Sequence, residues 1–268
     1  MTSNSRRGFA KTLGVASVGI GAFFAKVETA QAAVTDADIL QFALNLEYLE
    51  AEFYTVGMTG KTIDTMGVSI TGQGNSGTTT GGQQVNFFNN STLAVTVNQI
   101  GMDERAHVTL LQGALTSLGV MPIAKPAINL NALGTGFESP EAFLALARAF
   151  EDTGVSAYGG AAPLISSNAI LATAARILAT EALHTGNIRL HVALYQAATK
   201  ALDGADSLPP PSGSKYFATN AMGLTPVRTT GQVLNIVYGG AVGVTQGGFF
   251  PSGVNGNINT STSPATSN

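Results

Sequence analysis

The sequence predicts an all-α protein: a four-helix bundle with an irregular Gly/Thr-rich insertion between its first two helices and a C-terminal extension. Two observations support this prediction. Four long segments place apolar residues at helical spacing. Each of these segments also carries a glutamate within its apolar stripe. The chain has 268 residues, of which 44% are hydrophobic and 11% are charged. This length allows one large domain or two small ones.

The first 32 residues have the pattern of an export signal. Adjacent arginines, Arg6 and Arg7, precede an apolar run over 13–25, and small residues follow at 30–32. This order is typical of a bacterial signal peptide, and the paired arginines resemble the twin-arginine consensus. The apolar run is shorter than the roughly 20 residues needed to cross a bilayer. We therefore expect cleavage after Ala32, no stable membrane span, and passage through the twin-arginine translocase to the periplasm or the extracellular space.

Charge and cysteine content exclude several functions. Removal of residues 1–32 would leave 9 Lys and Arg against 15 Asp and Glu. Such a chain has no basic surplus to neutralise phosphates, so we expect no binding to nucleic acid. The absence of cysteine excludes a disulfide scaffold, a zinc ribbon and thiol catalysis.

The bundle domain is expected over residues 33–203. Its helices are predicted at about 36–56, 91–118, 139–158 and 167–201. Ser139 before Pro140 is a typical helix start, and Gly159-Gly160 is expected to end the third helix. Residues 57–90 contain eight Gly and seven Thr and are predicted to form an irregular insertion on the surface.

Residues 204–268 are expected to form a Pro/Gly-rich extension. A short helix is predicted near 230–238, and Phe249 and Phe250 are expected to plug the end of the bundle. Residues 256–268 are nearly all Asn, Thr and Ser, a composition that predicts a disordered tail.

The apolar stripes carry an ordered set of candidate ligands. Charged side chains are rarely buried without a partner, so these positions need an explanation. The first and third helices supply glutamates followed seven residues later by Tyr54 and Tyr158, and the second and fourth each supply Glu-x-x-His. This order suggests an internal duplication. In chain order the candidates are Glu47, Glu50, Glu104, His107, Glu151, Glu181 and His184.

Metal chemistry explains these residue types. Positions i and i+3 lie one above the other on a helix, so Glu and His in Glu-x-x-His can hold one metal ion between them. Two such helices with one Glu from each of the other two provide the ligands of a carboxylate-bridged dinuclear centre. Four carboxylates balance two divalent cations, whereas without metal some of them must bind protons. A metal-free bundle with protonated or His-paired carboxylates is the alternative interpretation.

Three sequence runs resemble a known family. They are ALNLEYLEAEFY at 43–54, QVLNIVYG at 232–239 and GGFFP at 247–251. They are similar to exported ferritin-like-domain proteins of bacteria, in the ferritin-like superfamily and related to plant desiccation-related proteins. The resemblance covers about residues 36–256. It implies a ferritin-like four-helix bundle with a long crossover over 119–139. It also assigns the ligand places to Glu47, Glu104, His107, Glu151, Glu181 and His184.

The expected function follows from this ligand set. Oxygen ligands with two imidazoles suit two iron or manganese ions, with dioxygen, peroxide or ferrous ion as the small reactant. Tyr54 and Tyr158 are candidate catalytic residues or hydrogen-bond partners of the ligands. Glu50 has no counterpart in the second half, where Gly154 stands, so it is an extra ligand, a substitute for Glu47 or a neighbouring acid. The alternative is a structural or stress-protective envelope protein without turnover. His191 is a further, weaker ligand candidate, and the oligomeric state is left open.

Overall fold

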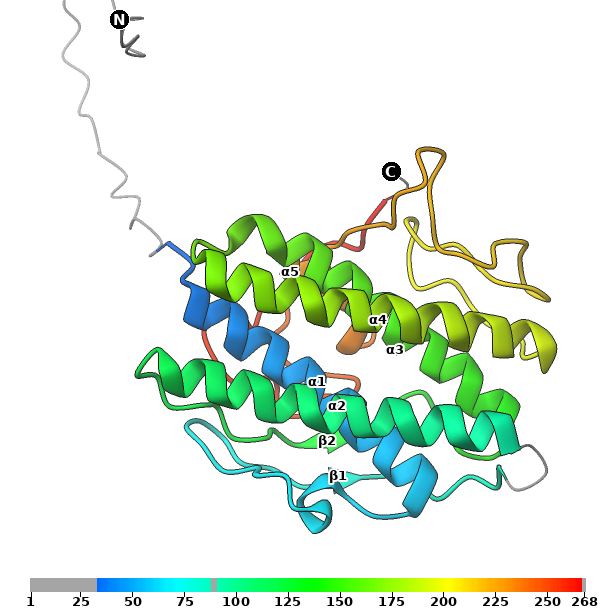
Figure 1. Ribbon diagram of the computed structural model, residues 1–268, viewed down its shortest axis with the longest axis horizontal. Coiled ribbons are helices and arrows are strands. Elements are labelled where there is room, and N and C mark those ends of the chain that lie inside the picture. The colour runs from blue at the N-terminus through cyan, green and yellow to red at the C-terminus, as the bar shows by residue number, and fades with distance from the viewer. Residues whose placement is uncertain (1–32, 88–90, 267–268) are drawn as a thin grey trace, which may run out of the picture. The chain divides into compact units, whose positions relative to one another are not determined.

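The computed structural model, which describes residues 33–87 and 91–266, is dominated by four long helices (Figure 1). These are α1 (Asp36–Thr59), α2 (Ser91–Ser117), α3 (Pro140–Ala161) and α4 (Asn168–Leu194). Helix α1 packs mainly on α2, and α3 mainly on α4. The all-α prediction is therefore confirmed. The predicted signal peptide over residues 1–32 lies outside the described part of the chain. Within the described part, no helix is long and apolar enough to cross a bilayer.

Local sequence explains where the helices begin. Thr35 caps α1 in a reciprocal arrangement with Asp38, in which each side chain bonds the other residue's backbone N–H. Ser139 caps α3, with Pro140 at the first helical position, where its missing N–H costs nothing. Ser167 caps α4 by accepting a hydrogen bond from the backbone of Ile170.

Helix α3 continues through the two glycines that were expected to end it. It reaches Ala161, and Gly159 and Gly160 lie inside the last turn. A Cβ at Gly160 would lie 1.9 Å from the carbonyl oxygen of Arg228. The glycines therefore permit close packing of the C-terminal extension on α3 rather than termination of the helix.

Helix α4 is shorter than predicted. It ends at Leu194, although residues 195–201 have helix-forming composition. Gln196 takes a left-handed conformation with φ 53°, and its side chain donates to the carbonyl of Ala193. Beyond this turn, the backbone N–H of Thr199 donates a hydrogen bond to the hydroxyl oxygen of Ser212 in the extension. Tertiary packing thus overrides helix propensity here.

The insertion packs along the crossover between α2 and α3. Helix α1 extends to Thr59, and the insertion beyond it includes the 3-10 helix η1 (Ile63–Met66) and strand β1 (Thr79–Thr80). Strand β1 pairs in parallel with β2 (Ile128–Asn129) of the crossover. A Cβ at Gly77 would lie 2.2 Å from the backbone nitrogen of Ala127. The glycine content of the insertion therefore supports backbone-to-backbone packing, in addition to loop formation.

The extension begins beyond α4 and includes helix α5 (Thr230–Val237). The short 3-10 helix η2 (Ala162–Leu164) joins α3 to α4.

The prediction that Phe249 and Phe250 plug the end of the bundle is wrong, because both residues lie elsewhere. Phe249 is buried against Phe150 in the middle of α3, with ring centroids 5.0 Å apart, and Phe250 packs near Tyr238. These aromatic residues fix the extension to the side of the bundle.

The prediction of a disordered tail is wrong for residues 256–266. Ser261 exchanges backbone hydrogen bonds with the segment around Val244, and Thr262 donates to the carbonyl of Gly231. Ser261 and Ala265 are buried. Small polar side chains fit closely against backbone, so a composition typical of disorder here forms an ordered strap.

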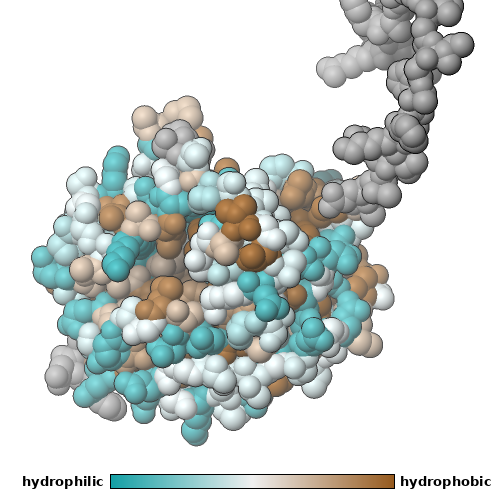
Figure 2. All heavy atoms as spheres, turned by 180° about the vertical axis from the view of Figure 1, so that it is seen from behind, coloured by the Kyte–Doolittle hydropathy of each residue, from teal (hydrophilic) through white to brown (hydrophobic). Residues whose placement is uncertain are grey.

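On the face of the molecule seen from behind, hydrophobic residues are interspersed with polar ones (Figure 2).

Candidate metal centre

The four helices bring four glutamates together in the interior. Glu47 of α1, Glu104 of α2, Glu151 of α3 and Glu181 of α4 are each no more than 1% exposed. Four carboxylates without water or cations around them would repel one another strongly. Their convergence therefore requires protons, imidazoles or metal ions between them.

Ligand atoms of six residues form two overlapping groups. One group contains Glu47, Glu104, His107 and Glu181, and the other contains Glu104, Glu151, Glu181 and His184. Within each group one ligand atom from every residue lies within 4.8 Å of the others. Glu104 and Glu181 belong to both groups, as bridging carboxylates would. Each group then adds one further glutamate and one histidine, a set of ligand atoms that is compatible with a metal site.

Several buried oxygen and nitrogen atoms in this cluster make no well-aligned hydrogen bond within the described structure, although most of them lie 3.0–3.6 Å from an imidazole or carboxylate atom of the same cluster. They are Glu47 Oε2, Glu104 Oε1, Glu151 Oε2, both oxygens of Glu181 and His184 Nδ1. Unpaired buried polar atoms are costly, and each of these atoms is a good metal donor. The donor set and its unsatisfied lone pairs therefore fit a pair of metal ions.

The two tyrosines occupy matching positions on α1 and α3, seven residues after Glu47 and Glu151. The hydroxyl of Tyr54 donates to Glu151 at 2.5 Å, and that of Tyr158 donates to Glu47 at 2.5 Å. Each tyrosine therefore bonds the glutamate of the other odd-numbered helix. This exchange follows the repeated sequence pattern and orients one oxygen of each carboxylate, leaving its second oxygen for the interior.

Burial and the charges of neighbouring groups shift the pKa values of the glutamates and of His184 in the cluster. Burial raises the pKa of Glu104 to about 7, and burial with repulsion from Glu104 raises the pKa of Glu181 well above its usual range. Burial would also raise the pKa of Glu47, but His107 close by lowers it below its ordinary value. Burial opposes protonation of His184, yet the nearby carboxylates of Glu104 and Glu151 raise the pKa of His184 to about 12. Without metal, the cluster therefore holds protons on both acids and imidazoles.

Glu50 lies beside the cluster but belongs to neither ligand group. Burial and repulsion from the other four glutamates raise the pKa of Glu50 well above its usual range. A Cβ at Gly154 would lie 3.3 Å from Glu50 Oε1 and 2.8 Å from Glu181 Oε2. The missing side chain at Gly154 therefore makes room for Glu50. This geometry favours a neighbouring acid over a substitute for Glu47, which is in place as a ligand candidate.

Asp103 is a residue of the site that sequence reasoning missed. Its carboxylate lies 3.2 Å from Nε2 of His184, while Nδ1 of the same ring lies 3.0 Å from Glu104. A carboxylate on the far nitrogen fixes the orientation and tautomer of a ligand histidine. Asp103 precedes Glu104 on α2 and contacts α4, so no periodic pattern on its own helix marks it. His191, by contrast, lies in neither ligand group.

A buried ion-pair network supports the same region of α3. Asp152, next to Glu151, accepts hydrogen bonds from Arg148 and from Arg189 of α4. Arg148 also bonds Asp206 of the extension at 2.7 Å. Truncating one partner of such a network leaves the other charge uncompensated. The network therefore holds α3, α4 and the extension together directly beside one of the candidate ligands.

Comparison with known families agrees with this architecture. A family model described as a ferritin-like domain matches residues 35–212, which is well over half of the chain. The chain therefore belongs to the ferritin-like domain family. Among curated proteins, none matches the chain. The buried carboxylate and histidine groups are compatible with a metal site in this family.

Proposed function

We propose that the protein binds two iron or manganese ions in this cluster and uses them for redox chemistry with dioxygen, peroxide or ferrous ion. The observation that carries the proposal is the pair of ligand groups that share Glu104 and Glu181. Glu47 with His107 would complete the ligands of one ion, and Glu151 with His184 those of the other. The paired arginines of the predicted signal support a periplasmic or extracellular location.

The protein's own residues prepare the site for this chemistry. Tyr54 and Tyr158 hold two of the carboxylates by short hydrogen bonds, and Asp103 orients His184. When bound, the metal ions would supply electron transfer and Lewis acidity. Glu50 is buried beside the ligands and raised in pKa, so it can hold a proton next to the reactants.

Turnover by reconstituted protein tests the redox role. Chelated protein is loaded anaerobically with Fe²⁺ or Mn²⁺, and ferrous oxidation and peroxide consumption are then measured. We expect turnover with at least one metal, at least tenfold lower turnover in Glu104→Gln, and unchanged turnover in Glu141→Gln, whose side chain lies exposed at the start of α3.

The rival function is a structural or stress-protective envelope protein. In that case the protein binds metal that raises its melting temperature, yet shows no oxidation of ferrous ion and no consumption of peroxide. Metal binding without turnover would therefore reject the redox role and keep the metal site.

A further inference from the structure

A large pocket opens between all four helices on the side of the metal cluster where α1 begins. Its volume is about 830 Å³, within the range of roughly 300–1,000 Å³ usual for small-molecule sites. Its wall is built by the first half of α1, the second half of α2, the end of α3 and the start of α4. In Figure 1, α2 and α4 cross the front of the bundle with α1 visible between them.

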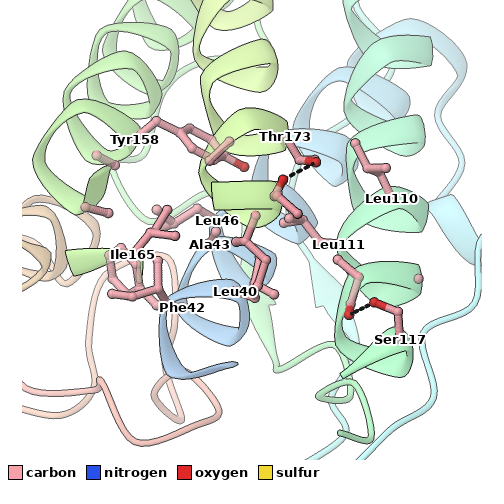
Figure 3. Close-up of a pocket in the computed structure, with 18 of the residues that line it drawn as sticks. Leu40, Phe42, Ala43, Leu46, Leu110, Leu111, Ser117, Tyr158, Ile165 and Thr173 are labelled. Carbon is pink, nitrogen blue, oxygen red and sulfur yellow. Dashed lines mark hydrogen bonds between the residues drawn. The ribbon is translucent and has the colours of Figure 1, made fainter. Parts of the chain in front are cut away.

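The wall of the pocket carries no charge. None of its lining residues is Asp, Glu, Lys, Arg or His, and most are aliphatic. Leu40, Ala43 and Leu46 of α1 line it together with Leu111 of α2 (Figure 3), and Ile170 of α4 completes this part of the wall. A charged ligand would therefore lose its hydration without gaining a partner. By electrostatic matching, the wall suits an uncharged molecule.

The hydroxyl groups of the wall are already used. Thr109 donates to the carbonyl of Arg105, Thr173 donates to that of Ala169, and Ser117 donates to that of Ala114. Two of these bonds are drawn in Figure 3. Each of these hydroxyls donates its single proton to a carbonyl of its own helix. These three hydroxyls therefore offer a ligand no free hydrogen-bond donor.

Tyr158 connects the pocket to the metal cluster. Tyr158 projects from α3 into the space between the helices (Figure 3), and its hydroxyl donates to Glu47. A molecule in the pocket would therefore lie against the ring of Tyr158, one hydrogen bond away from a candidate ligand. It would also displace water from this side of the cluster.

We propose that this pocket binds an uncharged hydrocarbon-like small molecule, a chain or ring compound without strong hydrogen-bonding groups. The inference goes beyond metal binding and does not depend on it, because none of the six candidate ligands lines the pocket. Burial of apolar surface against the aliphatic wall would drive binding.

Fluorescence titration tests the proposal. The probe is N-phenyl-1-naphthylamine, an uncharged apolar fluorophore, added to the protein without residues 1–32, both chelated and Mn²⁺-loaded. We expect saturable binding of one probe per chain in both forms. Competition should distinguish ligand charge: 1-decanol is expected to displace the probe at a concentration at least tenfold lower than decanoate at pH 8.

Variants locate the probe. Ala114→Phe on α2 and Thr173→Phe on α4 each place a ring in the pocket and are expected to weaken probe binding at least tenfold. Ala175→Phe is the matched control, because it adds the same ring at an exposed position of α4 outside the pocket. Melting curves check that all three variants fold.

Three results would overturn the proposal. They are an absence of saturable binding to the wild-type protein, equal effects of the pocket and control variants, and displacement by decanoate at least as effective as by 1-decanol. Because the titration is also run on chelated protein, its failure is distinguishable from failure of the metal site.

Discussion

Gly154→Ala should separate metal binding from folding. The new methyl group would lie 2.8 Å from Glu181 Oε2, about 0.6 Å closer than the 3.4 Å at which ordinary contact begins. Metal–ligand distances tolerate changes of only about 0.2 Å. Glu181 belongs to both ligand groups, so its displacement affects both metal ions. We expect metal affinity to fall at least tenfold, which corresponds to about 1.4 kcal/mol.

The stability of the metal-free protein should respond differently. Replacing glycine by alanine inside a helix stabilises it by up to about 1 kcal/mol. Movement of the uncoordinated Glu181 carboxylate offsets part of this gain. The free energy of unfolding of metal-free Gly154→Ala should therefore stay within about 1 kcal/mol of wild type.

Gly113→Ala on α2 is the control for this experiment. A Cβ at Gly113 meets nothing within 4 Å, so this variant should gain helix stability without any change in metal affinity. Calorimetric titration with Mn²⁺ measures affinity, and urea unfolding in chelator measures stability. Metal affinity of Gly154→Ala equal to that of Gly113→Ala would refute the placement of Glu181 at the centre of the site.

Three further predictions concern protons, metal and orientation. In the metal-free protein the pKa of Glu104 is raised from 4.5 to about 7, so its folded form keeps a proton that the unfolded chain releases. Its contribution to the free energy of unfolding should therefore fall as pH rises from about 4.5 to 7, by about 3 kcal/mol. Urea unfolding in chelator should show a steeper fall in wild type than in Glu104→Gln, which keeps the contributions of Glu50 and Glu181. Parallel pH curves of the two proteins would contradict this prediction. Chelation should lower the melting temperature of wild type, since metal held at 100 times its Kd stabilises the folded state by about 2.7 kcal/mol, and an unchanged melting temperature after verified metal removal would argue against a native metal site. Asp103→Asn should weaken metal binding roughly 10- to 100-fold, because the His184 ring loses the carboxylate that orients it. The control Asp64→Asn, in the insertion, should leave metal affinity unchanged. Equal metal affinities of the two variants would reject the orienting role of Asp103.

The candidate ligands could be predicted because their signal is local to each helix. A glutamate in an apolar stripe is visible on one helix at a time, and the repeated order of Glu and Glu-x-x-His relates the four helices. The structure places Glu47, Glu104, Glu151 and Glu181 in one cluster, as that pattern predicts. Their role as metal ligands stays a prediction.

The remaining features depend on contacts between distant segments. Asp103 acquires its role only because α2 and α4 place it against His184. Gly160 stands inside a helix because the backbone of Arg228 packs on it, which no local propensity reveals. The polar tail is ordered because its backbone pairs with residues near Gly231 and Val244. Such pairing depends on backbone geometry, whereas composition reports only local preference.

The shared ligands Glu104 and Glu181 are the central claim, and metal stoichiometry tests it most directly. The measurement is elemental analysis of the protein without residues 1–32, purified from its native host, beside the double variant Glu104→Gln/Glu181→Gln and the control Glu141→Gln. We predict about two iron or manganese atoms per chain in wild type and control, and fewer than about 0.2 in the double variant, as expected for a dinuclear centre with two bridging carboxylates. Two atoms per chain in all three proteins, or none in wild type, would contradict the account.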